Sequence, residues 1–433
     1  MIASLSGIRG IPNSDLSMAD VMRFATNFGT AAGFREFLLA RDSRSTGPAM
    51  AKAVAAGIVS LGAKVYDYGV ISTPALFRES RTKHLPAVMV TASHNEPQFN
   101  GLKFMVDGGG IGREMLEAIV GPARPRTGGF ARGSVKVAPS PRYVEDLVLL
   151  FGSGSCEGVK VAVDLGGGAA ISHTVPLLRR LGCEVMSMND TYGVFNRRVD
   201  PVADDLSLLR RTVKQKGYDI GLGFDCDGDR LVIVDSAGRK RTGDFMLTLA
   251  LSEMLPETGE RKVVVSLDTT QGVDDIVKKL DGRVYRSKVG EANVVRLMKE
   301  TGARLGGEGS SGGVIDGSFN YCRDSMLAAL SIIRALKTKG RKFYESVPVY
   351  CQERLALEIS GSKAQRALKK LAGEYKNADL TDGLKVMLPG RSWVLARPSG
   401  TEDIVRVSAE AKTQDKAAKL AKAFARKLKE LSR

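Results

Sequence analysis

Apolar and polar positions follow one another along the chain in a repeated order of short apolar runs, polar loops and helix-like segments. The apolar runs at 37–40, 63–66 and 86–90 predict buried strands, because each is short and bounded by polar or turn-forming residues. The alanine-rich segment 50–61 predicts a helix between two of these strands. Strands that alternate with helices predict an α/β fold.

The same order recurs twice, starting from the apolar runs at 159–164 and 262–267. After residue 348 the pattern changes to short strands and lysine-rich helices, and it ends in an amphipathic helix at 415–431. A chain of 433 residues is also too long for one ordinary core. We therefore predict three α/β units and a smaller α+β unit, at residues 1–150, 151–243, 244–345 and 346–433.

The composition fits a globular enzyme, with 43% hydrophobic residues, 26% charged residues and 48 glycines. No apolar run reaches the roughly 18 residues that a membrane-spanning helix needs. Arg9 interrupts the stretch that would have to be the apolar part of a signal peptide. We expect a cytoplasmic protein without a membrane partner.

The cysteines are five in number, scattered, and without a C-x-x-C pair. This pattern predicts free thiols in a reducing compartment and neither a disulfide framework nor a zinc site. The chain has only three histidines, which argues against a histidine-based metal site.

A formal charge of +16 makes the surface basic. Such a surface suits nucleic acid, an anionic membrane or small anionic substrates. Aromatic residues make up only 6% of the chain, and it has no RNA-recognition motif, zinc finger or long Lys/Arg run. The sequence therefore favours a phosphorylated metabolite over nucleic acid.

The first informative loop is TASHNEPQFNGLKF (91–104), which follows the apolar run 86–90 and presents Ser93 and His94. Adjacent residues of an extended chain point to opposite faces. We therefore expect that His94 does not act as the base for Ser93, and a hydrolase dyad does not explain the serine.

The second loop, GFDCDGDRLVIVD, carries Asp225, Asp227 and Asp229 at the end of a predicted strand. Carboxylates this close repel one another unless a cation or a basic neighbour offsets the charge. Oxygen ligands suit Mg²⁺, although an acidic turn without a metal is the alternative. An EF-hand is excluded because Arg230 and Ser236 stand where its glycine and glutamate are required.

Two further loops carry polar groups that could bind a ligand. GGEGSSGG (306–313) offers groups for sugar hydroxyls, although a flexible surface loop fits the same composition: Glu308, Ser310 and Ser311. ARPSGTED (396–403) could form an anion cradle, with a plain turn as the alternative: Arg397, Ser399, Thr401 and the Gly400 amide.

These four loops, in this order, resemble those of the α-D-phosphohexomutase family, which includes phosphoglucomutases, phosphomannomutases and phosphoglucosamine mutases. The resemblance begins with SGIRG (6–10) and covers essentially the whole chain. It implies three similar α/β domains and a C-terminal domain that resembles the TATA-binding protein, arranged around a central cleft.

The resemblance also implies a reaction. Ser93 would be a phosphoserine that gives and takes a phosphoryl group, converting hexose 6-phosphate and hexose 1-phosphate through a hexose 1,6-bisphosphate. Asp225, Asp227 and Asp229 would hold one Mg²⁺ per chain, with a phosphate oxygen on Ser93 as a further ligand. Such an enzyme mainly positions the phosphoryl group and stabilises its charge.

The remaining roles follow from the same resemblance. Arg9, Lys103 and Arg230 would line the reacting phosphoryl group. Lys103 is the candidate general acid/base, which would require that neighbouring cations lower its pKa. The distal phosphate would be held by four residues of the last loop: Arg397, Ser399, Gly400 and Thr401. Glu308, with Ser310 or Ser311, would read the sugar hydroxyls.

The glycines after Glu308 resemble archaeal-type members associated with phosphoglucosamine mutase activity. One extra serine leaves open whether Ser310 or Ser311 meets the sugar. We expect glucosamine phosphate as substrate, with phosphomannomutase or phosphoglucomutase activity as the alternative. A haloacid dehalogenase-type phosphatase is a more remote alternative, because D-x-D-G also marks its nucleophile. The expected partner is a phosphorylated hexose or hexosamine, with no nucleic acid, and the protein is expected to be a monomer or homodimer.

Overall fold

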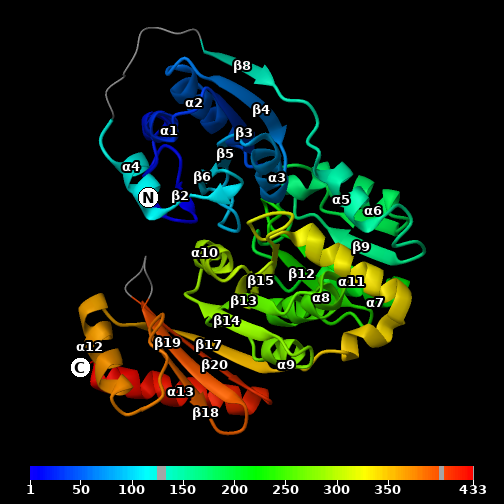
Figure 1. The fold of residues 1–433 in the computed structure, drawn as a ribbon, viewed down its shortest axis with the longest axis vertical. Helices are drawn as coiled ribbons and strands as arrows, with labels where there is room; N and C mark the ends of the chain where they lie inside the picture. Colours follow the sequence, from blue (N-terminus) through cyan, green and yellow to red (C-terminus); the bar gives the residue numbers. More distant parts are fainter. Residues whose placement is uncertain (124–132, 399–403, 433) are drawn as a thin grey trace.

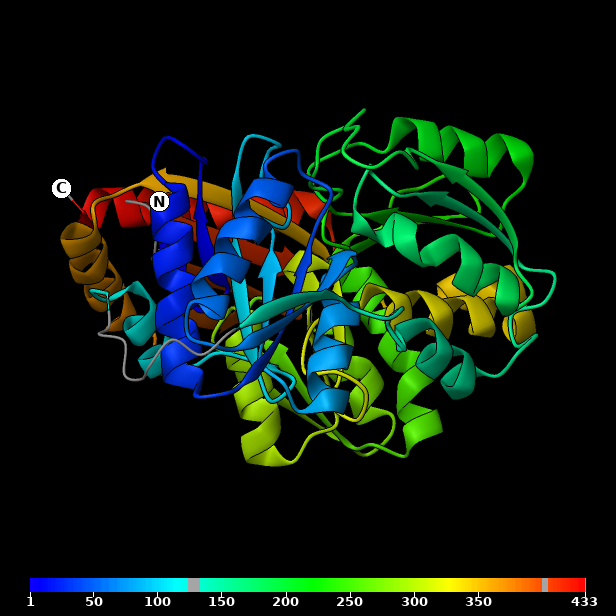
Figure 2. The ribbon, with the colours of Figure 1, turned by 90° about the horizontal axis from the view of Figure 1, so that it is seen from above.

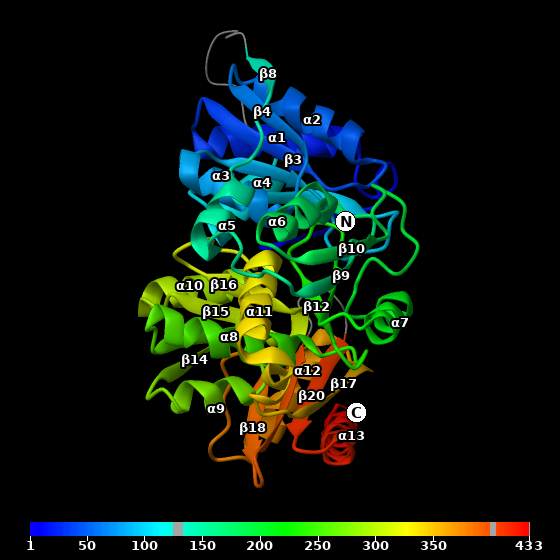
Figure 3. The ribbon, with the colours of Figure 1, turned by 90° about the vertical axis from the view of Figure 1, so that its right-hand side faces the viewer.

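The computed structural model describes residues 1–123, 133–398 and 404–432. Within these residues the strands form four sheets, and each sheet lies inside one of the four predicted units. Figure 3 shows the first unit at the top of the long axis and the fourth at the bottom. The fold of three α/β units and a smaller α+β unit is therefore confirmed, while the unit boundaries stay a prediction.

The first unit contains a twisted sheet in the order β1-β2-β6-β5-β3-β4-β8, with β7 paired to β6. Helices α1 and α2 pack on one face, where Phe24, Phe28 and Met50 are buried. The elements are β1 (Ile2–Ser4), β2 (Gly7–Gly10), α1 (Met18–Ala32), β3 (Glu36–Arg41), α2 (Gly47–Val59), β4 (Lys64–Val70), α3 (Thr73–Lys83), β5 (Ala87–Val90), β6 (Asn100–Val106), β7 (Gly109–Gly110), α4 (Arg113–Val120) and β8 (Ser134–Val137).

The second and third units have smaller sheets of the same order, β10-β9-β11-β12 and β14-β13-β15-β16. The second unit lies to the side of the first when seen from above (Figure 2). Helix α5 (Tyr143–Phe151) lies at the predicted boundary between the first two units. The elements of the second unit are β9 (Lys160–Asp164), a 3-10 turn (Ala169–Ser172), α6 (Thr174–Arg180), β10 (Glu184–Met188), α7 (Ser207–Lys216), β11 (Ile220–Phe224) and β12 (Leu231–Asp235). The third unit comprises α8 (Gly243–Thr258), β13 (Lys262–Ser266), α9 (Gly272–Lys278), β14 (Arg283–Ser287), α10 (Glu291–Thr301), β15 (Leu305–Glu308), a 3-10 turn (Gly309–Ser311), β16 (Gly313–Asp316), α11 (Ser325–Lys339) and a 3-10 turn (Gly340–Glu345).

The three α/β units share one topological feature that places the functional loops. Each sheet contains a set of parallel strands, and one of these pairs with an antiparallel strand that follows it directly in the chain. The antiparallel pairs are β5 with β6, β11 with β12, and β15 with β16. The loop inside that pair is the serine loop (91–99), the acidic loop (225–230) and the glycine-rich loop (309–312), respectively. Three equivalent positions of a repeated fold thus carry the three predicted motifs.

The fourth unit is an antiparallel sheet in the order β17-β20-β19-β18, covered by two helices (Figure 1). Its core contains Leu371, Leu384 and Leu428 and is separate from the other cores. The elements are β17 (Cys351–Glu358), α12 (Gly361–Ala372), β18 (Leu384–Leu388), β19 (Ser392–Pro398), β20 (Ile404–Ala411) and α13 (Gln414–Leu431).

One continuous core joins the three α/β units. It contains Leu76 of α3, Leu177 of α6, Met246 of α8 and Leu330 of α11, all fully buried. Because buried packing of this kind resists displacement, the three loops keep fixed positions relative to one another. No helix in the described part of the chain is both long enough and apolar enough to cross a bilayer.

One segment differs from the sequence-based expectation, and for a second segment the alternative of a flexible surface loop is wrong. Residues 100–106 form strand β6 and not part of a polar loop, because Leu102 and Phe104 are buried while Lys103 points to the other face. The segment 306–313 is not a flexible surface loop: β15 and β16 flank a short 3-10 turn, and Gly306, Gly307 and Gly313 are buried.

Candidate active site

The serine loop and the acidic loop meet between the first two units. The hydroxyl Oγ of Ser93 donates a hydrogen bond to Oδ2 of Asp225 over 3.1 Å, and both residues are fully buried. The acidic loop is further fixed from α3, where the Thr73 hydroxyl donates to Oδ2 of Asp227 over 2.5 Å. The predicted serine and aspartates therefore lie in one site.

Ser93 adopts an unusual backbone conformation, with φ of 53°. The Thr91 hydroxyl accepts the Ser93 N–H over 2.8 Å and donates to Asp42 over 2.6 Å, which holds the turn. The expectation that Ser93 and His94 point to opposite faces is wrong, because the left-handed turn brings Oγ and Nδ1 within 3.4 Å.

His94 is nevertheless a poor base. Burial, followed by the charges of Arg230 and Arg9, lowers the pKa of His94 to about 2. The shorter hydrogen bond of the Ser93 hydroxyl also goes to Asp225. The pair therefore lacks the properties of a hydrolase dyad.

Arg44 holds the backbone of the serine loop and was not singled out by the sequence. Its guanidinium is buried and donates to four loop carbonyls, those of Ser93, Asn95, Glu96 and Phe99, at 2.7, 2.6, 2.6 and 2.9 Å. Its Nε donates to Asp42 over 3.1 Å. A single arginine in a polar loop looks like a surface charge in sequence, because its burial depends on tertiary packing.

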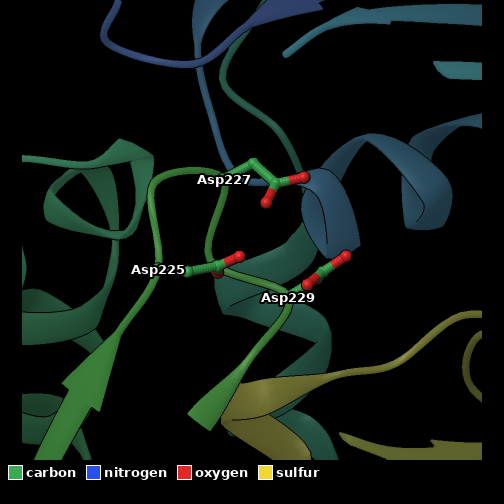
Figure 4. Close-up of side chains that lie close together, drawn as sticks. All are labelled: Asp225, Asp227 and Asp229. Carbon is green, nitrogen blue, oxygen red and sulfur yellow. The ribbon is translucent and has the colours of Figure 1, made fainter. Parts of the chain in front are cut away.

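The acidic loop brings the three predicted aspartates together (Figure 4). One oxygen from each of Asp225, Asp227 and Asp229 lies within 4.8 Å of the others, and all three are buried. Burial and the neighbouring carboxylates raise the pKa of Asp225 well above its usual value. Oδ1 of Asp227 and Oδ1 of Asp229 have no hydrogen-bond partner among the described residues. A buried oxygen-only set with two unsatisfied oxygens fits a hard divalent cation such as Mg²⁺.

Basic side chains surround these carboxylates. Nζ of Lys103 donates to Asp227 over 2.6 Å and to Asp229 over 2.9 Å. Burial lowers the pKa of Lys103, but the two carboxylates outweigh it and raise the pKa above its ordinary value. The expectation of a lowered pKa is therefore wrong, because the nearest charges are carboxylates and not cations.

The other two predicted basic residues also lie beside the acidic loop. Nη1 of Arg9 donates to Asn95 of the serine loop over 2.8 Å, and burial lowers the pKa of Arg9. The backbone N–H of Arg230 donates to Asp225 over 3.2 Å, and its guanidinium lies 3.7 Å from Asp200. Nε of Arg230 is buried without a described partner.

Arg323, which the sequence reasoning missed, joins the acidic loop to the third unit. Its Nη2 donates to Asp229 over 2.9 Å, and its Nη1 donates to Glu308 over 3.4 Å. Gly313 makes room for it, since a Cβ there would lie 2.3 Å from the Arg323 side chain. Nothing in the sequence distinguishes this arginine, which stands just before helix α11.

Glu308 ends strand β15 and is held in place from two sides. Its Oε1 accepts the Gly290 N–H over 2.7 Å and its Oε2 faces Arg323, while burial raises its pKa. Of the two candidate serines, Ser311 has a buried hydroxyl without a described partner. Because buried hydroxyls normally have a hydrogen-bond partner, this unsatisfied hydroxyl favours Ser311 over Ser310 as a ligand contact.

A cavity of about 460 Å³ lies beside this site, and its wall includes residues of all four units. The first unit contributes His94, the second Arg230, the third Ser310 and Ser311, and the fourth Arg397. Nε of Arg397 lies 3.7 Å from Asp382. The other predicted phosphate ligands, Ser399, Gly400 and Thr401, lie outside the described residues. A cavity of this size accepts a small polar molecule.

Family models describe four successive parts of the chain. They are phosphoglucomutase/phosphomannomutase alpha/beta/alpha domain I at 2–124, domain II at 141–238, domain III at 242–351, and the C-terminal domain at 357–427.

Individual relatives match over nearly the full length. A probable phosphoglucosamine mutase of Methanopyrus kandleri is 32% identical, over 97% of this chain and 96% of that protein. A phosphoglucomutase/phosphomannomutase of Thermococcus kodakarensis is 33% identical, over 95% of this chain and 94% of that protein. The crystal structure of a phosphoglucomutase/phosphomannomutase family protein from Burkholderia thailandensis matches with a TM-score of 0.88 at 25% identity. The match covers 99% of this chain and 98% of that one.

Proposed function

The chain belongs to the phosphoglucomutase/phosphomannomutase family, and from this premise we propose that it interconverts glucosamine 6-phosphate and glucosamine 1-phosphate through a phosphoserine at Ser93. The observation that carries the proposal is the Ser93 hydroxyl, 3.1 Å from Asp225 of a buried acidic cluster. This cluster adjoins residues that line a cavity shared by all four units.

In the proposed reaction, a hydroxyl of the sugar monophosphate attacks the phosphoryl group on Ser93. The bond between phosphorus and Oγ breaks, a bond between phosphorus and the sugar oxygen forms, and the hydroxyl proton is passed on to the serine oxygen. After the 1,6-bisphosphate turns around, its other phosphate returns to Ser93 by the reverse step. We assign the proton exchange to Lys103 because of its position beside the acidic loop, where a divalent cation on Asp227 and Asp229 would offset the carboxylate charges that raise its pKa.

The acidic loop would hold a divalent cation through Asp225, Asp227 and Asp229. When bound, Mg²⁺ would neutralise charge on the transferred phosphoryl group. The protein's own cations, Arg9 beside the serine loop and Arg230 at the end of the acidic loop, would orient the phosphoryl oxygens. Positioning and charge stabilisation are the main contributions that this chemistry requires.

A substrate that binds in two orientations needs a clamp for the phosphate that does not react. We assign this clamp to Arg397, together with Ser399, Gly400 and Thr401, and the reading of sugar hydroxyls to Glu308 and Ser311. The glycine-rich loop and the archaeal relative named a probable phosphoglucosamine mutase favour the amino sugar. The relative named phosphoglucomutase/phosphomannomutase supports glucose or mannose phosphate as alternatives. A cytoplasmic monomer or homodimer stays a prediction.

The test compares Ser93→Ala with wild type in coupled assays of glucosamine, glucose and mannose phosphates. Ser93→Ala should lose turnover of every sugar. Ser60→Ala should keep it, because Ser60 follows the end of α2 and its hydroxyl donates to the Gly57 carbonyl. Full turnover by Ser93→Ala would refute the mechanism. The phosphoenzyme should be acid-stable. Lability to hydroxylamine would instead indicate an aspartyl phosphate, as in a haloacid dehalogenase-type phosphatase.

A further inference from the structure

We propose that Asp268 is a specificity-determining residue that binds the ammonium group of a 2-amino sugar phosphate. The inference rests on the proposed function and deepens it, because it assigns the preference for an amino sugar to one side chain. Asp268 lies in the wall of the cavity that also includes Arg230, Ser311 and Arg397.

The topology of the third unit places Asp268 beside the sugar-reading glutamate. Strand β13 ends at Ser266 and pairs in parallel with β15, which ends at Glu308. The carboxyl ends of adjacent parallel strands meet at one edge of a sheet, where ligands bind. A hydrogen bond of 3.1 Å from the Gly309 N–H to the Thr269 hydroxyl joins the two loops directly.

Main-chain hydrogen bonds fix the loop that carries Asp268. The Leu267 carbonyl accepts from Nζ of Lys385 over 2.5 Å, and the Thr269 carbonyl accepts from Arg286 over 2.5 Å. The carbonyl of Asp268 itself accepts from Gln352 of the fourth unit over 3.3 Å. The carboxylate is therefore presented from a rigid loop, as a specific binding group requires.

The carboxylate of Asp268 has no cationic partner within the described residues. Its Oδ1 accepts from the Ser266 hydroxyl over 2.7 Å, and no cation of the described residues lies within ion-pair distance of it. The other carboxylate in the cavity wall, Asp200, faces Arg230 at 3.7 Å. Arg323 offsets the charge of Glu308, which can therefore accept from neutral sugar hydroxyls but leaves no unpaired charge for a ligand cation. Asp268 is thus the wall carboxylate left to bind an ammonium group.

An unpaired carboxylate is costly in a cavity built for sugar phosphates. Arginines of the wall attract the phosphate groups, but a ligand that offers only neutral groups to Asp268 leaves the charge of this carboxylate without a partner. Glucose and mannose phosphates offer only neutral hydroxyls at C2, whereas glucosamine phosphate offers an ammonium group. A charge-assisted hydrogen bond from that ammonium would supply the missing partner.

The two monophosphates bind in opposite orientations, and their C2 substituents therefore face different parts of the wall. Only one of them, glucosamine 1-phosphate or glucosamine 6-phosphate, should place its amine next to Asp268. The inference therefore predicts an asymmetric effect, confined to one amino sugar phosphate.

The test measures dissociation constants by isothermal titration calorimetry on the full chain in a Ser93→Ala background, which prevents interconversion of the ligands during the titration. Asp268 is compared with the isosteric Asp268→Asn substitution in this background, with Mg²⁺ at neutral pH. The ligands are glucosamine 1-phosphate, glucosamine 6-phosphate and the two glucose counterparts. Asp268→Asn should weaken one amino sugar phosphate roughly ten- to hundredfold, with its glucose counterpart unchanged or tighter. Ser266→Ala keeps the carboxylate and should keep the discrimination.

An equal loss for amino and neutral sugars, or no loss for either, would overturn the inference. Glucose phosphate turnover by wild type reports separately on the proposed reaction. If that turnover is present while Asp268→Asn binds the amino sugars normally, only the inference fails. If wild type turns over none of the sugar phosphates, the proposed function fails whatever the binding data show.

Discussion

The clearest structural prediction concerns Arg44, whose guanidinium holds the serine loop. A guanidinium has five N–H donors, and all five of Arg44 are used, four on loop carbonyls and one on Asp42. Lysine has three donors. In Arg44→Lys at least two buried acceptors therefore lose their donor.

Each buried acceptor left without a partner costs about 1–3 kcal/mol, so Arg44→Lys should destabilise the protein by about 2–6 kcal/mol. A domain is typically stable by about 5–15 kcal/mol, so a folded variant with a loosened serine loop is expected. The left-handed conformation of Ser93 depends on this loop. Turnover should fall more than substrate affinity, because the serine is displaced while the cavity wall of the third and fourth units stays intact.

The assay combines urea unfolding with hydrogen exchange of the amides at 93–99 and steady-state kinetics. The matched control is Arg41→Lys, because Arg41 is partly exposed and its guanidinium makes one hydrogen bond, to the Asp42 carbonyl over 3.2 Å. The control should change stability by less than about 0.5 kcal/mol. If Arg44→Lys matches Arg41→Lys in exchange at 93–99 and in kcat, the reasoning is refuted.

Three further predictions follow from single features of the site and the core. Mg²⁺ should raise the melting temperature because it relieves repulsion within the acidic loop, and Asp227→Asn should remove most of this shift; a full shift in the variant would contradict the cation site. Ser311→Ala should raise KM roughly two- to tenfold and Ser310→Ala less, because only the Ser311 hydroxyl is buried without a described partner; the reverse order would contradict the assignment. Burial lowers the pKa of His173 to about 4 from an ordinary value of 6.5. As pH falls, this histidine therefore takes up a proton in the unfolded chain before it does so in the folded one. The free energy of unfolding should drop by up to about 3 kcal/mol between pH 6.5 and 4, and His173→Gln should lack this drop. Equal pH dependence of the free energy of unfolding in wild type and His173→Gln would contradict the prediction.

The sequence predicted the fold class well because apolar runs and helical periodicity reflect burial directly. The strands at 37–40 and 86–90 and the helix at 415–431 recur in the structure within a few residues as β3, β5 and α13. Strand β6 was missed, because the asparagine-rich segment before it masks the alternation of Leu102 and Phe104.

The loops that carry chemistry were recognisable because their residue types and spacing are unusual. Arg44 and Arg323 were not, because a buried arginine and a surface arginine look alike in sequence. The geometry of Ser93 and His94 was mispredicted for a similar reason. The left-handed turn depends on the Thr91 hydroxyl, which accepts from the Ser93 N–H and donates to Asp42, and no local residue preference predicts this arrangement. Long-range packing decides these features.

The proposed reaction requires that Ser93 carries the phosphoryl group. The most direct measurement is tandem mass spectrometry of the full-length protein after incubation with glucosamine 1,6-bisphosphate and Mg²⁺. We predict one phosphate per chain, on the peptide that contains Ser93 and at that residue. A phosphate on Asp225, or sustained mutase turnover with Ser93 unmodified throughout, would contradict the account.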